Sequence, residues 1–137
     1  MPDSKDNIAD LKEKFRKEHF AISWGMQMLE LAPGYAKFSL KLKPEYQNFN
    51  GLVFGGIIMS IADMAFAYCV NSLNRPSVDI NFDIQFIAAP KPDDELISEG
   101  KVIKTGRRLS IAEMTVTNQE GKLIAKATGT TIRLDKS

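Results

Sequence analysis

Residues 55–70 read GGIIMSIADMAFAYCV, and this stretch decides the fold. Apart from Ser60 and Asp63, every residue in it is apolar or glycine. A run of this length with apolar residues on all sides predicts a buried helix. Because a carboxylate is almost never fully buried without a partner, a buried Asp63 needs a reason. It is either a candidate catalytic group or a packing residue held by a hydrogen bond.

Extended segments flank this helix along the chain. Before it, the sequence predicts a disordered start at 1–6, a short amphipathic helix at 7–18, and a hairpin whose strands, 23–31 and 36–42, are joined at Pro33-Gly34. A loop covers 44–54, the helix runs to about residue 73, and strands are expected at 77–89, 94–105, 108–117 and 122–134. This order predicts one α+β domain over residues 1–137, with an antiparallel sheet wrapped around a long central helix.

Composition narrows the classes of function. The chain has 18 Lys and Arg against 17 Asp and Glu, so it carries no general electrostatic signal for nucleic acid or a membrane surface. The start of the chain lacks a basic segment followed by an apolar one, and the run at 55–70 is too short to span a membrane. A single cysteine, Cys69, and a single histidine, His19, argue against a disulfide and a metal site. We therefore expect a cytoplasmic protein that needs no metal.

Five residues at and before the helix have a characteristic spacing: Asn48, Gly51, Gly55, Gly56 and Asp63. The spacing resembles the signature of hot-dog-fold acyl-CoA thioesterases of the PaaI-like, phenylacetate-pathway type, and the resemblance extends over about residues 20–134. It implies a hot-dog fold and hydrolysis of an acyl-CoA to the free acid and CoA, with no cofactor apart from the CoA of the substrate. It also implies a homodimer, which in PaaI-like proteins often pairs into a tetramer.

Phe54 departs from the pattern, because the family usually has a histidine at this position. Phe54 is then either part of the wall of the substrate pocket or a sign that activity is lost. The second possibility leaves a non-catalytic acyl-CoA-binding or sensing protein as the alternative function. A hydratase of the same fold is a weaker alternative, because the Asp-then-His pair of that chemistry is absent from the sequence.

The chemistry of thioester hydrolysis can be assigned to the helix itself. The reaction places negative charge on the carbonyl oxygen, and the N–H groups of Gly55 and Gly56 at the helix N-terminus are suited to receive it. The two glycines could instead only fit the turn against the sheet. Asp63 would act as a general base or as a nucleophile. Gly55 and Asp63 lie about 12 Å apart along the helix, so a site that uses both should join two subunits of a twofold dimer.

Other polar residues are candidates for binding the substrate. Asn48 could hydrogen-bond the thioester carbonyl or orient water, or it could only close a turn of the loop. In relatives a Ser or Thr on the strand after the helix assists the attacking water, and the candidates here are Ser77, Asp79 and Asn81.

A basic cluster at residues 104–108 consists of Lys104, Arg107 and Arg108. Guanidinium groups suit the geometry of phosphates, so Arg107 and Arg108 could hold the phosphates of coenzyme A. They could equally be solvated charges in a turn.

Overall fold

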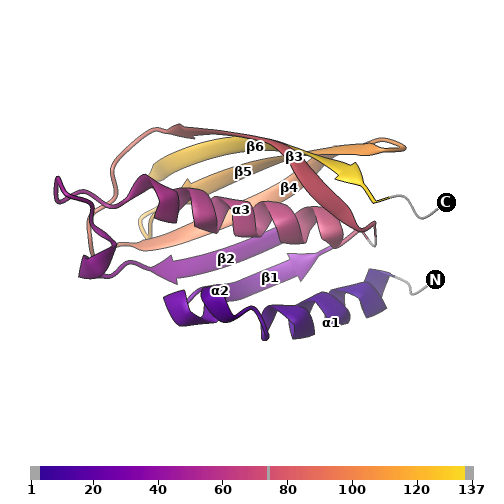
Figure 1. The fold of residues 1–137 in the computed structure, drawn as a ribbon, viewed down its shortest axis with the longest axis horizontal. Helices are drawn as coiled ribbons and strands as arrows, with labels where there is room; N and C mark the ends of the chain where they lie inside the picture. Colours follow the sequence, from indigo (N-terminus) through magenta and orange to yellow (C-terminus); the bar gives the residue numbers. More distant parts are fainter. Residues whose placement is uncertain (1–3, 74, 135–137) are drawn as a thin grey trace.

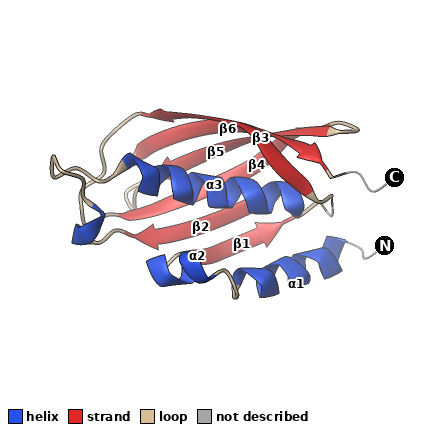
Figure 2. Cartoon of the chain, in the orientation of Figure 1, coloured by secondary structure: helices blue, strands red, loops and turns tan. Residues whose placement is uncertain are grey.

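A computed structural model describes residues 4–73 and 75–134 of the chain. The central helix and the strands of the expected α+β fold are present (Figures 1 and 2). In chain order the elements are α1 (Ser4–Phe15), α2 (His19–Trp24), β1 (Gln27–Ala32), β2 (Tyr35–Lys41), the 3-10 turn η1 (Pro44–Tyr46), α3 (Gly55–Asn71), β3 (Ser77–Phe86), β4 (Glu95–Thr105), β5 (Leu109–Thr117) and β6 (Leu123–Arg133).

All six strands form one antiparallel sheet in the order β1-β2-β4-β5-β6-β3. Pro33 and Gly34 make the tight turn between β1 and β2, and Gly34 has a φ of 78°, which suits glycine at the third position of such a turn. α3 joins β2 to β3, so the chain crosses the face of the sheet and β3 becomes an edge strand.

The core lies between α3 and the sheet. α3 contacts mainly β2, β4 and β5, and it buries ten of its 17 residues. Phe66 illustrates the closeness of this packing, because a Cβ atom added to Gly129 of β6 would lie only 2.4 Å from the Phe66 ring. The hot-dog arrangement expected from the sequence, a sheet wrapped around one long helix, is therefore confirmed.

Several predicted boundaries are wrong at the N-terminal end. The first helix starts at Ser4 and ends at Phe15, not at 7–18, and residues 1–3 of the segment expected to be disordered lie outside the described residues. The strand expected at 23–31 begins at Gln27, because α2 occupies His19–Trp24. α2 is ended by Gly25, whose φ of 84° is left-handed. The hairpin turn, the long helix and the last four strands match their predictions to within a few residues.

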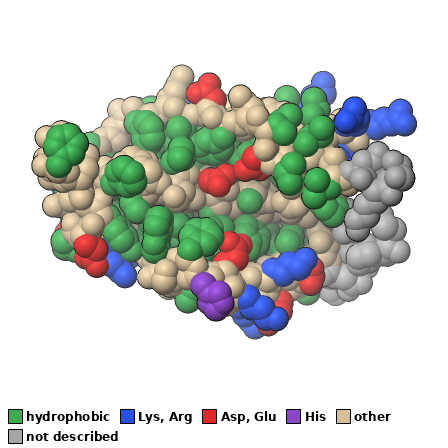
Figure 3. All heavy atoms as spheres, in the orientation of Figure 1, with side chains coloured by type: hydrophobic (Ala, Val, Ile, Leu, Met, Phe, Trp, Pro, Cys, Tyr) green, Lys and Arg blue, Asp and Glu red, His purple; other side chains and the backbone are tan. Residues whose placement is uncertain are grey.

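Many large apolar side chains remain at the surface on the α3 side of the molecule (Figure 3). The exposed large apolar side chains on the loop before α3, on α3 and at or just after the end of β3 are Phe49, Leu52, Phe54, Met59, Phe86 and Ile87. Such a concentration of exposed apolar residues is typical of a surface that binds a partner or a ligand. Within the described residues, no helix is both long enough and apolar enough to cross a membrane.

Candidate active site

The N-terminus of α3 carries the Gly55-Gly56 pair, as the sequence predicted. N–H groups in the first turn of a helix have no partner inside the helix, so those of Gly55 and Gly56 can receive a ligand. The ring of Phe54 covers Gly56 so closely that an added Cβ would lie 2.4 Å from it. Gly55 is more open, because its added Cβ would contact only the Phe86 ring, at 3.5 Å. Two aromatic rings that are each about half exposed thus flank the glycine pair, Phe54 at 55% and Phe86 at 54%.

The expected burial of Asp63 is wrong for the single chain, because its side chain is exposed. The sheet covers only one side of α3, and the row formed by Met59, Asp63 and Ala67 at four-residue spacing is not buried by it. Asp63 is therefore accessible to a ligand or to a second subunit. Its distance from Gly55 along α3 remains about 12 Å.

Asp79 of β3 lies close enough to Asp63 of α3 for the two carboxyl groups to share a hydrogen bond, and both side chains are exposed in the single chain. Partial burial, this hydrogen bond and the negative charge of Asp63 together raise the pKa of Asp79 to about 6. Two carboxyl groups can hydrogen-bond only when one of them holds a proton, and below about pH 6 that proton is on Asp79. Of the three strand residues considered from the sequence, Asp79 is the one that the structure brings to Asp63.

A β-bulge explains why Asp79 faces the helix. Between Asp79 and Asn81, β3 advances two residues while its partner β6 advances one, so Ile80 is the extra residue. On one side of the bulge Phe82 pairs with Gly129 and packs on Phe66 of α3, with ring centroids 5.8 Å apart. On the other side of the bulge, Asp79 is the residue that lies on the α3 face of the sheet.

The other two strand candidates lie elsewhere. Asn81 pairs with Thr130, at a position that alternation places on the side of the sheet away from α3. Ser77 lies at the far end of α3, where its backbone N–H donates to Asn71 Oδ1 (3.2 Å) and its hydroxyl donates to the Arg75 carbonyl (2.7 Å). Ser77 therefore fixes the connection between α3 and β3.

Asn48 closes the loop that precedes α3. Its Oδ1 accepts hydrogen bonds from the N–H groups of Asn50 (2.9 Å) and Leu52 (3.2 Å), and its own N–H donates to the Leu52 carbonyl (2.6 Å). Asn48 therefore has the turn-closing role, one of the two considered from the sequence. With Oδ1 used in this way, the side-chain NH₂ is the part of Asn48 that could still bind a substrate carbonyl.

Arg107 and Arg108 belong to the turn between β4 and β5, at the end of the sheet opposite the glycine pair (Figure 1). This turn is held by Arg75, whose guanidinium donates to the carbonyls of Gly106 (2.7 Å) and Arg107 (2.8 Å). A pocket of about 360 Å³ at the turn is lined by Lys104, Gly106, Arg107, Arg108, Leu109 and Ile111. Within one chain these cations do not lie with Gly55.

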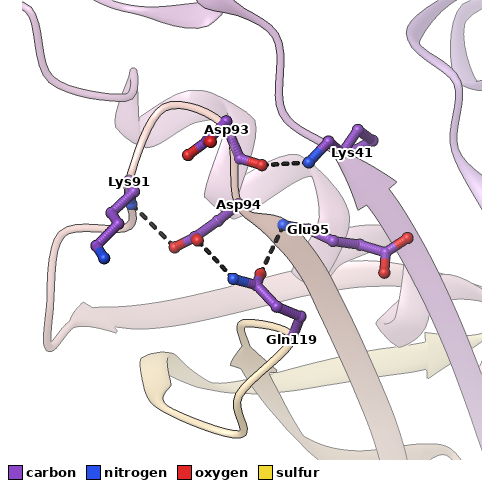
Figure 4. A pocket seen from close by; sticks show the side chains of 6 residues that line it. All are labelled: Lys41, Lys91, Asp93, Asp94, Glu95 and Gln119. Carbon is purple, nitrogen blue, oxygen red and sulfur yellow. Dashed lines mark hydrogen bonds between the residues drawn. The ribbon is translucent and has the colours of Figure 1, made fainter.

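A second polar cluster joins the turn before β4 to the turn before β6 (Figure 4). The buried Asp94 carboxylate accepts hydrogen bonds from the Lys91 N–H (2.9 Å), the Gln119 side chain (2.8 Å) and, more weakly, the Asn118 side chain (3.5 Å). Burial disfavours the charge, but the hydrogen bonds outweigh it and hold the pKa of Asp94 below its usual range. Since its oxygens are used within the protein, Asp94 is a structural residue.

The part of the chain that the structure describes contains no group of three or more His, Cys, Asp or Glu side chains that could hold a metal ion. Near α3 the structure presents the N–H groups at the helix N-terminus and the two carboxyls, Asp63 and Asp79.

Known proteins resemble this chain in both sequence and structure. The family model described as "Thioesterase superfamily" matches residues 50–125, which include the glycine pair and Asp63. A relative from Archaeoglobus fulgidus is 36% identical over 80% of this chain and 71% of its own length. The acyl-coenzyme A thioesterase PaaI of Escherichia coli is 24% identical over 88% of this chain and 86% of its own.

Solved structures agree with these sequence matches. The E. coli PaaI structure superimposes with a TM-score of 0.89 over 96% of this chain and 94% of its own, and at 23% identity it supports the fold. A hypothetical thioesterase of Streptococcus pneumoniae, solved with coenzyme A, has a TM-score of 0.81 at 28% identity over 88% of this chain and 96% of its own. The resemblance to PaaI-like proteins and the expectation of a thioester hydrolase are both confirmed: the chain belongs to the Thioesterase superfamily, with the hot-dog fold.

Proposed function

We propose that the protein hydrolyses acyl-CoA thioesters at sites shared between the two subunits of a homodimer, and that two dimers pair into a tetramer. The observation that carries this proposal is the arrangement of α3. One helix presents free N–H groups at Gly55 and Gly56 and an accessible carboxylate at Asp63, about 12 Å apart. Neither group alone completes a hydrolytic site, since the developing oxyanion and the attacking water need separate partners.

The edge strand β3 supports a dimer. In the described chain this ten-residue strand pairs on one side only, with β6, and exposed apolar residues such as Ile80 (56%) lie along it. A long free edge of this kind is a template for pairing with another strand. The opposite edge strand, β1, is shorter and is contacted by α1.

Antiparallel pairing of two β3 strands would bring the required groups together. Gly55 lies beside Phe86 at one end of β3, and Asp63 bonds to Asp79 nearer the other end. A twofold axis near the middle of the strand sets the Phe86 end of one subunit against the Asp79 region of its partner. Each dimer then has two equivalent sites.

In each site the thioester carbonyl oxygen would sit at the N–H groups of Gly55 and Gly56. Asp63 of the other subunit would act either as the general base that takes a proton from water or as the nucleophile that forms an acyl-enzyme anhydride. The rings of Phe54 and Phe86 would contact the acyl group. Asn48 would approach the carbonyl through its side-chain NH₂.

The basic turn at Arg107 and Arg108 would bind the phosphates of coenzyme A. The same twofold pairing moves this turn from the far end of its own α3 toward the Gly55 end of the partner helix. Arginine at an exposed turn binds phosphate by charge and by paired hydrogen bonds, so this contact should affect KM more than kcat.

The test is hydrolysis of a panel of aromatic, short-chain and long-chain acyl-CoAs, with the release of free thiol as the measured signal. Asp63→Asn should keep the fold and the oligomeric state while lowering kcat by several orders of magnitude, with a small effect on substrate binding. Glu113→Gln, which changes an exposed acid of β5 away from α3 and from the β3 edge, is the control and should retain activity. Near-normal turnover by a folded Asp63→Asn protein would refute the assignment.

A non-catalytic acyl-CoA-binding or sensing protein is the second candidate. The observation that favours it is the Phe54 ring, which covers Gly56 beside the N–H groups that would receive the oxyanion. A binder would show saturable affinity for acyl-CoA in calorimetry and no thiol release with any member of the panel.

A further inference from the structure

Asp63 alone would be a poor general base at neutral pH. An ordinary aspartate has a pKa of about 3.9, whereas a general base works best when its pKa is near the operating pH. The surroundings of Asp63 therefore matter for the proposed reaction. Its hydrogen bond to Asp79 places a second carboxyl in direct contact with it, on a strand that a bulge has turned toward the helix.

We propose that Asp79 is a positioning residue for the hydrolytic reaction, and that the Asp63–Asp79 pair accepts the proton of the attacking water as one unit. This inference rests on the proposed function and goes beyond it, because it assigns the proton acceptor to two residues of one subunit. Two carboxylates in contact repel each other, so the doubly ionised pair binds a proton more tightly than either group would alone.

Thr131 provides an independent observation at the same place. Thr131 is the register partner of Asp79 on β6, and its side chain is 1% exposed. Its hydroxyl has no hydrogen-bond partner in the described chain. Paired residues on antiparallel strands point to the same face, so this hydroxyl lies on the Asp79 side of the sheet. It can donate a hydrogen bond to Asp79 when the pair has lost its proton.

The charged and titratable groups around the pair are few. On α3 these are Asp63 itself and Cys69, whose thiol has a pKa raised mainly by burial and to a smaller extent by the charge of Asp79. On β6 the positions facing α3 near Asp79 are Gly129 and Thr131, and Arg133 follows at the end of the strand, opposite Ser77. The influences that raise the pKa of Asp79 to about 6 are partial burial and Asp63.

The pH dependence has a definite sign. Below about pH 6 the pair holds one proton and cannot accept another from water without forming the doubly protonated state. Above about pH 6 both groups are ionised and the pair is an efficient acceptor. We expect kcat/KM of the wild type to rise with pH through this range and then to level off.

Asp79→Asn removes the second charge while keeping the shape of the side chain. The group that titrates near pH 6 in the wild type is then absent, so the rising part of the pH profile should move to lower pH. Because the weaker base gains less from proton transfer, the plateau of kcat should fall about tenfold while KM changes little. Glu113→Gln, which changes an exposed acid of β5 away from the β3 edge, is the control and should leave both the profile and the plateau unchanged.

A second measurement does not depend on activity. Carbon-13 NMR of aspartate carboxyl carbons in the free protein should show one group titrating near pH 6, which disappears in Asp79→Asn and shifts to an ordinary value in Asp63→Asn. If no acyl-CoA is hydrolysed, the proposed function fails, and the NMR titration still tests the pair. The inference is overturned if no carboxyl titrates above about pH 5, or if the profile of Asp79→Asn superimposes on that of the wild type.

Discussion

Gly129 of β6 lies directly against the Phe66 ring of α3. An added Cβ at this position would lie 2.4 Å from Cζ and 2.5 Å from Cε2 of Phe66. Carbon atoms in contact normally stay about 3.5–4.0 Å apart, so the ring would have to move by more than 1 Å. Phe66 is fully buried and packs on Phe82, so it has no free space to enter. Gly129→Ala should therefore destabilise the protein by about 2 kcal/mol and lower Tm by roughly 5–10 °C.

Urea unfolding of the wild type and four variants tests this expectation. Gly129→Ala should lower the urea midpoint with an unchanged m-value, while Thr128→Ser at the exposed neighbouring position should change stability by less than about 0.5 kcal/mol. In a Phe66→Leu background the same glycine substitution should be about 1 kcal/mol less destabilising, because the clashing ring atoms are gone. A Gly129→Ala protein as stable as Thr128→Ser, or one whose effect is independent of Phe66, would show that this contact does not hold α3 in place.

Three further predictions concern single sites. Phe54→His should keep the fold and change kcat or acyl preference only a few-fold, as steady-state kinetics on the acyl-CoA panel would show; activity that appears only in this variant would favour the binding protein. Asp94→Asn should lower the urea midpoint at pH 7, and the difference from the wild type should shrink as the pH falls below about 4. A carboxylate whose pKa is lowered in the folded state stabilises the fold above its unfolded-state pKa, and this stabilisation is lost when the carboxylate is protonated. The double change of Arg107 and Arg108 to Ala should raise KM for acyl-CoA and leave kcat unchanged, whereas kinetics with an acyl-N-acetylcysteamine thioester, which lacks the phosphates, should not respond.

The sequence was most informative where a pattern depends on local geometry. The apolar run with Gly55-Gly56 at its start predicted α3 and its N-terminus correctly, and four extended segments predicted β3 to β6. The segment 23–31 was misread because its apolar residues suit a strand, whereas in the structure α2 ends at Trp24 and Gly25 turns the chain into β1.

The surroundings of Asp63 could not be predicted in the same way. In Ser77–Phe86 the polar and apolar residues alternate without a break, which would place Ile80 toward the helix and Asp79 away from it. The bulge at Ile80 exchanges the two faces for residues 77–79, and the bulge itself depends on the register of β3 with β6. The exposure of Asp63 likewise depends on how far the sheet reaches around α3. Both features are tertiary, so residue spacing along the chain carries no signal for them.

The most direct test of the shared site uses two inactive variants. Gly55→Pro removes one N–H at the first position of α3, where proline fits a helix and the preceding Phe54 has a suitable extended ψ of 127°. Gly55→Ala is its control, because an added Cβ meets only ordinary contacts and the N–H is kept. Gly55→Pro and Asp63→Asn should each be nearly inactive alone.

Co-expression of Gly55→Pro and Asp63→Asn with different affinity tags gives a random mixture in which about half of the dimers are hybrids. If each site takes Gly55 from one subunit and Asp63 from the other, every hybrid has one intact site, and the mixture should show about a quarter of the wild-type thioesterase activity. Hybrids shown to form by native mass spectrometry but without any recovered activity would place Gly55 and Asp63 of one site in the same chain, and would contradict the account.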